Sequence, residues 1–93
     1  MLRSFADKET EKVWNRERSR LFGPDLQMAA HRKLLLLDAA EDLADLRVPL
    51  GNRLEKLHGD RKGQHSIRIN QQWRICFRWT PSGPEVVEIV DYH

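Results

Sequence analysis

The chain has 93 residues, of which 40% are apolar and 32% are charged, and its formal net charge is +2. This length predicts one domain over residues 1–93 with a single core. No stretch approaches the roughly 20 apolar residues of a membrane span, and the charged opening lacks a secretory signal. The lone Cys76 excludes an internal disulfide, so we expect a cytoplasmic protein without membrane contact.

The first half of the chain predicts two helices. Residues 2–5 form an apolar opening that suggests a short edge strand. Asp7 is a suitable N-cap for a helix that runs to about Arg20, since acids fall in its first turn and arginines near its end. A Gly-Pro pair breaks this helix, and Asp25 can cap a second one over residues 26–46, where Leu and Ala follow helical spacing.

The second half predicts strands. Its elements are a short mixed segment, a hairpin loop and three alternating or β-branched runs, at residues 53–57, 58–63, 66–70, 73–79 and 85–90. Two N-terminal helices packed on an antiparallel sheet give an α+β fold. We expect the helices to cover one face and the other, polar face to carry Arg68, Arg74 and Arg78.

Charge is distributed unevenly along the chain. Residues 47–78 contain eight Lys or Arg and two acids, a local balance of +6, whereas residues 1–46 balance to −1 and residues 79–93 to −3. A basic segment of this kind favours a polyanion, most commonly a nucleic acid. The chain ends in Asp91, Tyr92 and His93, all types that can hold or move a proton. Together these features suggest a nuclease.

Several segments in this order resemble the HigB group of the RelE/ParE-like toxins from bacterial toxin–antitoxin pairs. The matching segments extend over essentially the whole chain: residues 4–5, 8–11, 51–64, 66–70, 72–77 and 91–93. The resemblance implies a RelE-like fold and a toxin that cuts mRNA in the ribosomal A site, with the RNA 2′-OH as nucleophile and without metal or other cofactor. It also implies an adjacent helix-turn-helix antitoxin, HigA-like, through which alone the pair binds operator DNA.

The resemblance also assigns roles to residues. The active-site Arg of the family falls on Arg74, and its terminal proton-transfer group falls on Asp91, Tyr92 and His93. Some relatives carry a His four residues before the Gly-Asp-Arg loop. Here that position is Glu55, and His58 directly precedes the loop, so both are candidates for proton transfer.

The residues themselves fit these roles. His93 is the best acid or base because imidazole titrates near neutral pH, and Arg74 offers a planar guanidinium to phosphate. We expect RNA contacts from cations around the loop and sheet: Arg53, Lys56, His58, Arg61, Lys62 and Arg68. Asp91 shares the strand parity of His93, so Tyr92 is expected to point the other way. The histidines and Cys76 show no metal-ligand spacing.

Two other functions fit parts of the pattern. One is a ParE-like toxin that inhibits DNA gyrase without cutting RNA, which would not need a proton-transfer residue at its end. The other is a plain basic interaction domain, such as a ribosomal or DNA-binding accessory protein, which leaves the terminal Asp-Tyr-His motif unexplained. The terminus therefore favours the endoribonuclease.

Overall fold

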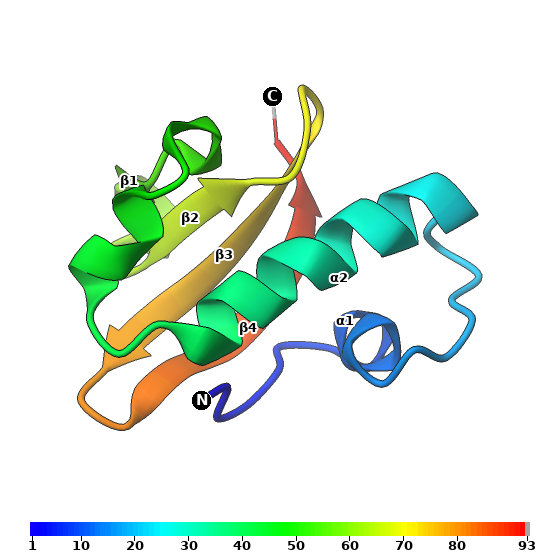
Figure 1. Ribbon diagram of the computed structural model, residues 1–93, viewed down its shortest axis with the longest axis horizontal. Coiled ribbons are helices and arrows are strands. Elements are labelled where there is room, and N and C mark those ends of the chain that lie inside the picture. Colours follow the sequence, from blue (N-terminus) through cyan, green and yellow to red (C-terminus); the bar gives the residue numbers. More distant parts are fainter. Residues whose placement is uncertain (93) are drawn as a thin grey trace.

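A computed structural model describes residues 1–92 of the protein. Its four strands form one antiparallel sheet in the order β1-β2-β3-β4, with bounds Glu55–Lys56, His65–Arg68, Trp73–Thr80 and Gly83–Asp91. Helices α1 (Lys8–Trp14) and α2 (Pro24–Ala39) lie together on one face of this sheet (Figure 1). Three short 3₁₀ helices, η1 (Leu43–Arg47), η2 (Leu50–Asn52) and η3 (Gly59–Arg61), connect α2, β1 and β2. The predicted α+β architecture is confirmed.

Both helices are shorter than predicted. Asp7 does cap α1, accepting a hydrogen bond from the Thr10 N–H at 2.7 Å, but the helix ends at Trp14 rather than near Arg20. Arg16, with φ of 59°, adopts a left-handed conformation that a right-handed helix cannot include. The arginines expected in its last turns therefore lie in a loop.

The second helix also departs from the prediction at both ends. Gly23 is the N-cap and Pro24 the first helical residue, so Asp25 lies inside the first turn. The helix ends at Ala39 because Asp42 and Asp45 form a capping box that starts η1 instead. The predicted helix to Leu46 is thus divided in two.

The strand predictions are closer to the structure. Segment 58–63, which contains η3, and segment 70–72 lie in the connections between strands, as expected. The strand predicted at 73–79 continues one residue further, to Thr80. The N-terminal segment forms a single parallel bridge, between Phe5 and Val87, rather than a strand. A bulge in β4 places Val86 at φ of 46°, and the Val86 N–H donates to Ser4 Oγ at 2.9 Å.

The core lies between the helices and the sheet. Ile67, Ile75 and Ile89 form a buried row across β2, β3 and β4, and they pack with buried α1 and α2 side chains such as Val13 and Leu34. Trp73 and Trp79 are partly buried against this core, as their alternation predicted. No helix of residues 1–92 is long and apolar enough to cross a membrane.

The opposite face of the sheet is not the solvated surface that the alternation predicted. Arg78 is exposed there, but Ser66 and Cys76 are buried and Arg74 is only 7% exposed. The chain between η2 and β2 folds over this face, because the Arg53 carbonyl and the Arg61 side chain both contact groups of the sheet. We call this the covered face.

Candidate active site

Arg74 lies at the centre of the covered face and is anchored from one edge of its guanidinium. Its Nε donates to Ser66 Oγ at 2.8 Å, and its Nη2 donates to the carbonyls of Arg53 at 2.6 Å and Ser66 at 3.4 Å. Its Nη1 donates to no group within residues 1–92. The sequence predicted that the planar guanidinium of Arg74 binds phosphate. In the structure, Nε and Nη2 donate to groups of the protein, and Nη1 remains for a ligand.

Tyr92 and Asp91 lie on opposite sides of β4. The Tyr92 ring is 5.6 Å from Cζ of Arg74, so it belongs to the covered face. Asp91 pairs in register with Trp73, and its Oδ2 accepts a hydrogen bond from Gln72 Nε2 at 3.0 Å. This separation agrees with the expected strand parity. The predicted acid–base residue His93 lies outside the described residues.

Strand register also places Glu55 on the face of Arg74. Glu55 pairs with Ser66, which pairs with Cys76, which pairs with Glu88, and side chains directly opposite one another in a sheet share a face. Glu55 is exposed at the edge strand β1. Of the predicted carboxylates, Glu55 therefore shares the face of Arg74, whereas Asp91 falls in the register of the helix side.

Two of the six residues expected to bind RNA are already engaged. Arg61 contacts Glu88 Oε1 at 3.1 Å and Gln64 Oε1 at 3.1 Å, and Arg68 Nε donates to the Asn70 carbonyl at 3.0 Å. Sequence reasoning missed Glu88, which lies on another strand and is brought near Arg61 only by the fold, and it also missed the local acceptors Gln64 and Asn70.

The remaining predicted cations are divided between the two sides of the sheet. Arg53, His58 and Lys62 are exposed along the segment that crosses the covered face. Lys56 pairs with His65, in the row that contains Phe77, so it lies on the helix side and away from Arg74.

Two titratable groups of β2 and β3 have shifted pKa values. Burial, with a smaller contribution from Lys56, lowers the pKa of His65, whose Nδ1 is buried without a hydrogen-bond partner among residues 1–92. Burial raises the pKa of the Cys76 thiol, which therefore fits a packed side chain better than a nucleophile. Within residues 1–92, no group of His, Cys, Asp and Glu could hold a metal ion.

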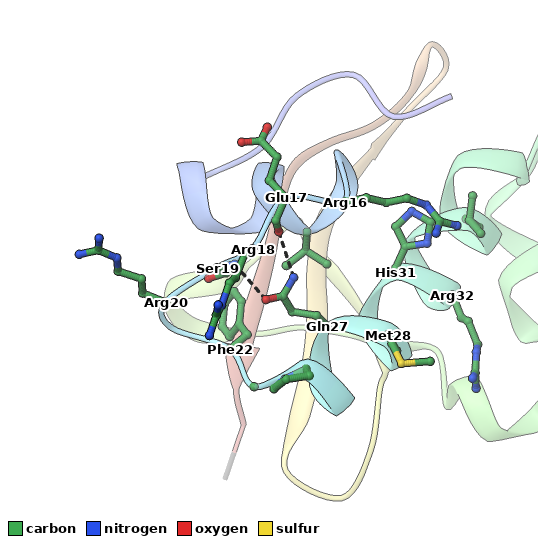
Figure 2. Close-up of a pocket in the computed structure, with 14 residues that line it drawn as sticks. Arg16, Glu17, Arg18, Ser19, Arg20, Phe22, Gln27, Met28, His31 and Arg32 are labelled. Carbon is green, nitrogen blue, oxygen red and sulfur yellow. Dashed lines mark hydrogen bonds between the residues drawn. The ribbon is translucent and has the colours of Figure 1, made fainter.

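A groove of 1140 Å³ lies elsewhere, between α2 and the loop that precedes it (Figure 2). None of the site residues predicted from the sequence line it. Phe22, one of its lining residues, packs edge-to-face on Trp73 with ring centroids 5.6 Å apart, which places the groove on the helix side of the sheet.

Comparison with known proteins gives a consistent result. The model of the family described as the RelE-like toxin of type II toxin–antitoxin system HigB matches residues 3–93. Toxin HigB-1 of Vibrio cholerae serotype O1 is 45% identical over 80 residues, which are 85% of this chain and 84% of that protein. Endoribonuclease HigB of Proteus vulgaris is 31% identical over 61 residues, 66% of this chain and 65% of that protein.

Proposed function

Because this chain belongs to the HigB family of RelE-like toxins from type II toxin–antitoxin systems, we propose that it is a ribosome-dependent mRNA endoribonuclease. The name of the Proteus vulgaris relative, Endoribonuclease HigB, supports cleavage of RNA. We also propose that a HigA-like helix-turn-helix antitoxin neutralises it in the cytoplasm and provides the contacts to operator DNA. The observation that carries the proposal is the position of Arg74, which is held by hydrogen bonds to Ser66 and Arg53 and lies 5.6 Å from the Tyr92 ring.

The proposed reaction is transesterification within the RNA. A base removes the proton of the 2′-OH, and this oxygen attacks the adjacent phosphorus. The bond to the 5′-oxygen breaks, and that oxygen takes a proton from an acid. The products are a 2′,3′-cyclic phosphate and a 5′-OH, with no change of oxidation state and no added water.

The arrangement of the covered face suits the stabilisation of charge in this reaction. Nη1 of Arg74 would donate to a phosphate oxygen as negative charge develops there, and the other edge of the guanidinium is already fixed. The Tyr92 ring is exposed enough to stack on a base. Glu55 and His93 are the proposed proton-transfer groups, with Asp91 orienting the chain terminus.

The proposed dependence on the ribosome is supported by how little this surface offers to orient an RNA strand. Arg61 and Arg68 are bound to acceptors within the protein, so orientation of an RNA strand would depend mainly on the exposed Arg53, His58 and Lys62. Orientation of reacting groups can contribute about 7–11 kcal/mol of a barrier. We propose that the ribosome, by holding the mRNA in its A site, supplies this orientation.

Induction of the toxin without antitoxin tests the proposal. Primer extension should find breaks in translated messages and not in the same messages with the start codon removed, and the fragments should carry 5′-OH ends that a polynucleotide kinase labels directly. His93→Gln should reduce cleavage by about 10²–10⁴-fold, because Gln hydrogen-bonds but does not titrate. Growth arrest with intact mRNA and accumulated gyrase–DNA breaks would instead support the ParE-like alternative.

A further inference from the structure

The groove between α2 and the 15–23 loop is a second basic surface, on the helix side of the sheet (Figure 2). Four of its lining residues are arginines, against the single acid Glu17: Arg16, Arg18, Arg20 and Arg32. All four are exposed, and within residues 1–92 none of them forms an ion pair. The groove therefore presents positive charge that the protein does not itself neutralise.

Apolar side chains alternate with this charge along α2. Met28 is 61% exposed and Leu35 is 46% exposed, and both line the groove with Arg32 between them. These three residues follow i, i+4, i+7 spacing, so they form one stripe on the helix surface. Exposed apolar side chains that cluster in a groove are typical of a protein-binding site rather than of ordinary surface.

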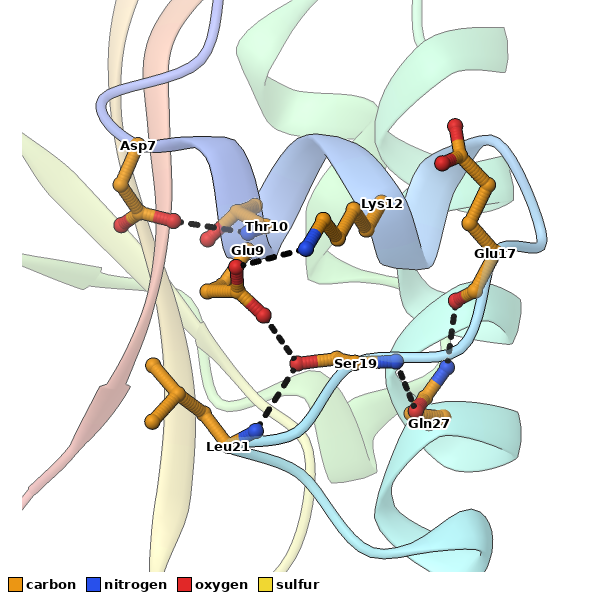
Figure 3. A network of polar contacts seen from close by, with 8 residues as sticks. All are labelled: Asp7, Glu9, Thr10, Lys12, Glu17, Ser19, Leu21 and Gln27. Atoms are coloured by element: carbon orange, nitrogen blue, oxygen red, sulfur yellow. Dashed lines mark hydrogen bonds and ion pairs between the residues drawn. The ribbon is translucent and has the colours of Figure 1, made fainter.

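The loop that forms the other wall is held in place by a polar network (Figure 3). Ser19, only 5% exposed, donates from Oγ to Glu9 Oε1 at 2.7 Å and from its N–H to Gln27 Oε1 at 2.9 Å. Gln27 in turn donates to the Glu17 carbonyl at 3.0 Å, and the bonds from Ser19 and Lys12 lower the pKa of Glu9. A wall fixed in this way costs a partner less ordering entropy.

We propose that this groove is the docking site for an acidic amphipathic helix of the cognate antitoxin. Unpaired arginines match acids on such a helix, while Met28 and Leu35 match its apolar face, in the helix-in-groove mode of recognition. RNA would match the arginines but would leave the exposed apolar stripe uncovered. The antitoxin would then bind on the helix side and leave Arg74 and Tyr92 open.

This inference rests on the toxin–antitoxin part of the proposed function and not on RNA cleavage. The test is titration calorimetry of purified toxin with the full-length antitoxin encoded beside it. Met28→Asp and the double variant Arg16→Glu/Arg32→Glu should each weaken binding at least about tenfold, as removal of central anchors and reversal of charge do at interfaces. In cells, both variants should stay toxic when the antitoxin is co-expressed.

Matched controls come from exposed residues outside the groove. Leu50→Asp introduces the same acid at an exposed apolar residue, and Arg3→Glu/Arg47→Glu reverses two exposed arginines. Both controls should bind the antitoxin within about threefold of the unmodified toxin, as near-neutral positions away from an anchor do. Circular dichroism checks folding, and Arg16→Gln/Arg32→Gln replaces the reversal if that variant is unfolded.

Equal antitoxin affinity for the groove variants and the unmodified toxin would overturn the proposal. So would a loss of binding to ribosomes with antitoxin affinity unchanged, since the groove would then be an RNA surface. Failure of RNA cleavage is a separate result, because calorimetry measures antitoxin binding whether or not the toxin cuts mRNA.

Discussion

The covered face and the groove are both rich in arginine, but they differ in how much of that arginine is available to a partner. On the covered face, Arg61, Arg68 and Arg74 each donate to an acceptor of the protein. In the groove, four exposed arginines have no ion pair within residues 1–92. Formal charge and available charge are therefore different properties of a surface.

The sequence shows only the first of these properties. Residues 47–78 carry a balance of +6 and residues 1–46 a balance of −1, so the charge pattern predicts a binding surface in the basic segment alone. Among the acids of the N-terminal part, however, only Glu17 lines the groove, and several others are engaged within the protein. Glu9 binds Lys12 and Ser19, Asp38 accepts from the Leu2 N–H, and Asp42 caps η1.

Truncation of Arg74 should produce the largest effect. Arg74→Ala leaves the buried Ser66 hydroxyl and the Arg53 carbonyl without their donor, and each such loss costs about 1–3 kcal/mol of unfolding free energy. The sequence predicted only that Arg74 lies on a polar face of the sheet, and its burial adds a structural role to the proposed catalytic one. Urea denaturation measures the loss, and cleavage should be abolished even at temperatures where the variant is folded.

Controls from each surface sharpen this result. Arg78→Ala on the covered face and Arg32→Ala in the groove remove exposed side chains and should change the unfolding free energy by less than about 0.5 kcal/mol. If Arg74→Ala were as stable as these two, its hydrogen bonds would not support the fold, and the contrast between the surfaces would be lost.

The extent of successful prediction follows from the range of the interactions involved. Alternation in residues 73–79 and the cap at Asp7 are local, and the structure confirms both. The end of α1 depends on a left-handed Arg16, and the burial of Arg74 depends on Arg53, 21 residues away in sequence. Neither a left-handed conformation at a single arginine nor a hydrogen bond between residues 21 positions apart produces a periodicity that the sequence could reveal.

Loosening the groove should have a moderate effect. Ser19→Ala removes the hydrogen bonds to Glu9 and from the Leu21 N–H, and should cost about 1–2 kcal/mol of unfolding free energy. It should also weaken antitoxin binding, because the loop must then be ordered on association. Toxicity without antitoxin should be unchanged. Ser82→Ala, at an exposed turn, is the control, and a similar affinity loss there would argue against preorganisation of the loop.

A smaller effect should come from pH, through the partly buried imidazole of His65. Burial and Lys56 lower the pKa of His65 from its ordinary 6.5, so the unfolded chain binds this proton more readily than the folded one. The resulting stability is present above pH 6.5 and is lost as pH falls through the lower folded pKa. Thermal unfolding of His65→Gln should show a shallower loss below that pH. An unchanged slope would contradict this assignment.

The smallest effect is expected from a substitution that frees the ion-paired Arg61 on the covered face. Glu88→Gln removes the carboxylate that holds Arg61 at 3.1 Å and, since both side chains are about one-third exposed, should cost only about 0.2–1 kcal/mol of stability. The released Arg61 can then meet an RNA phosphate and steepen the salt dependence of single-strand binding by about 0.7. Glu85→Gln makes the same change in net charge but has only the 3.9 Å contact to the exposed Arg78. Equal salt slopes for the two variants would mean that net charge, and not the release of Arg61, controls RNA binding on the covered face.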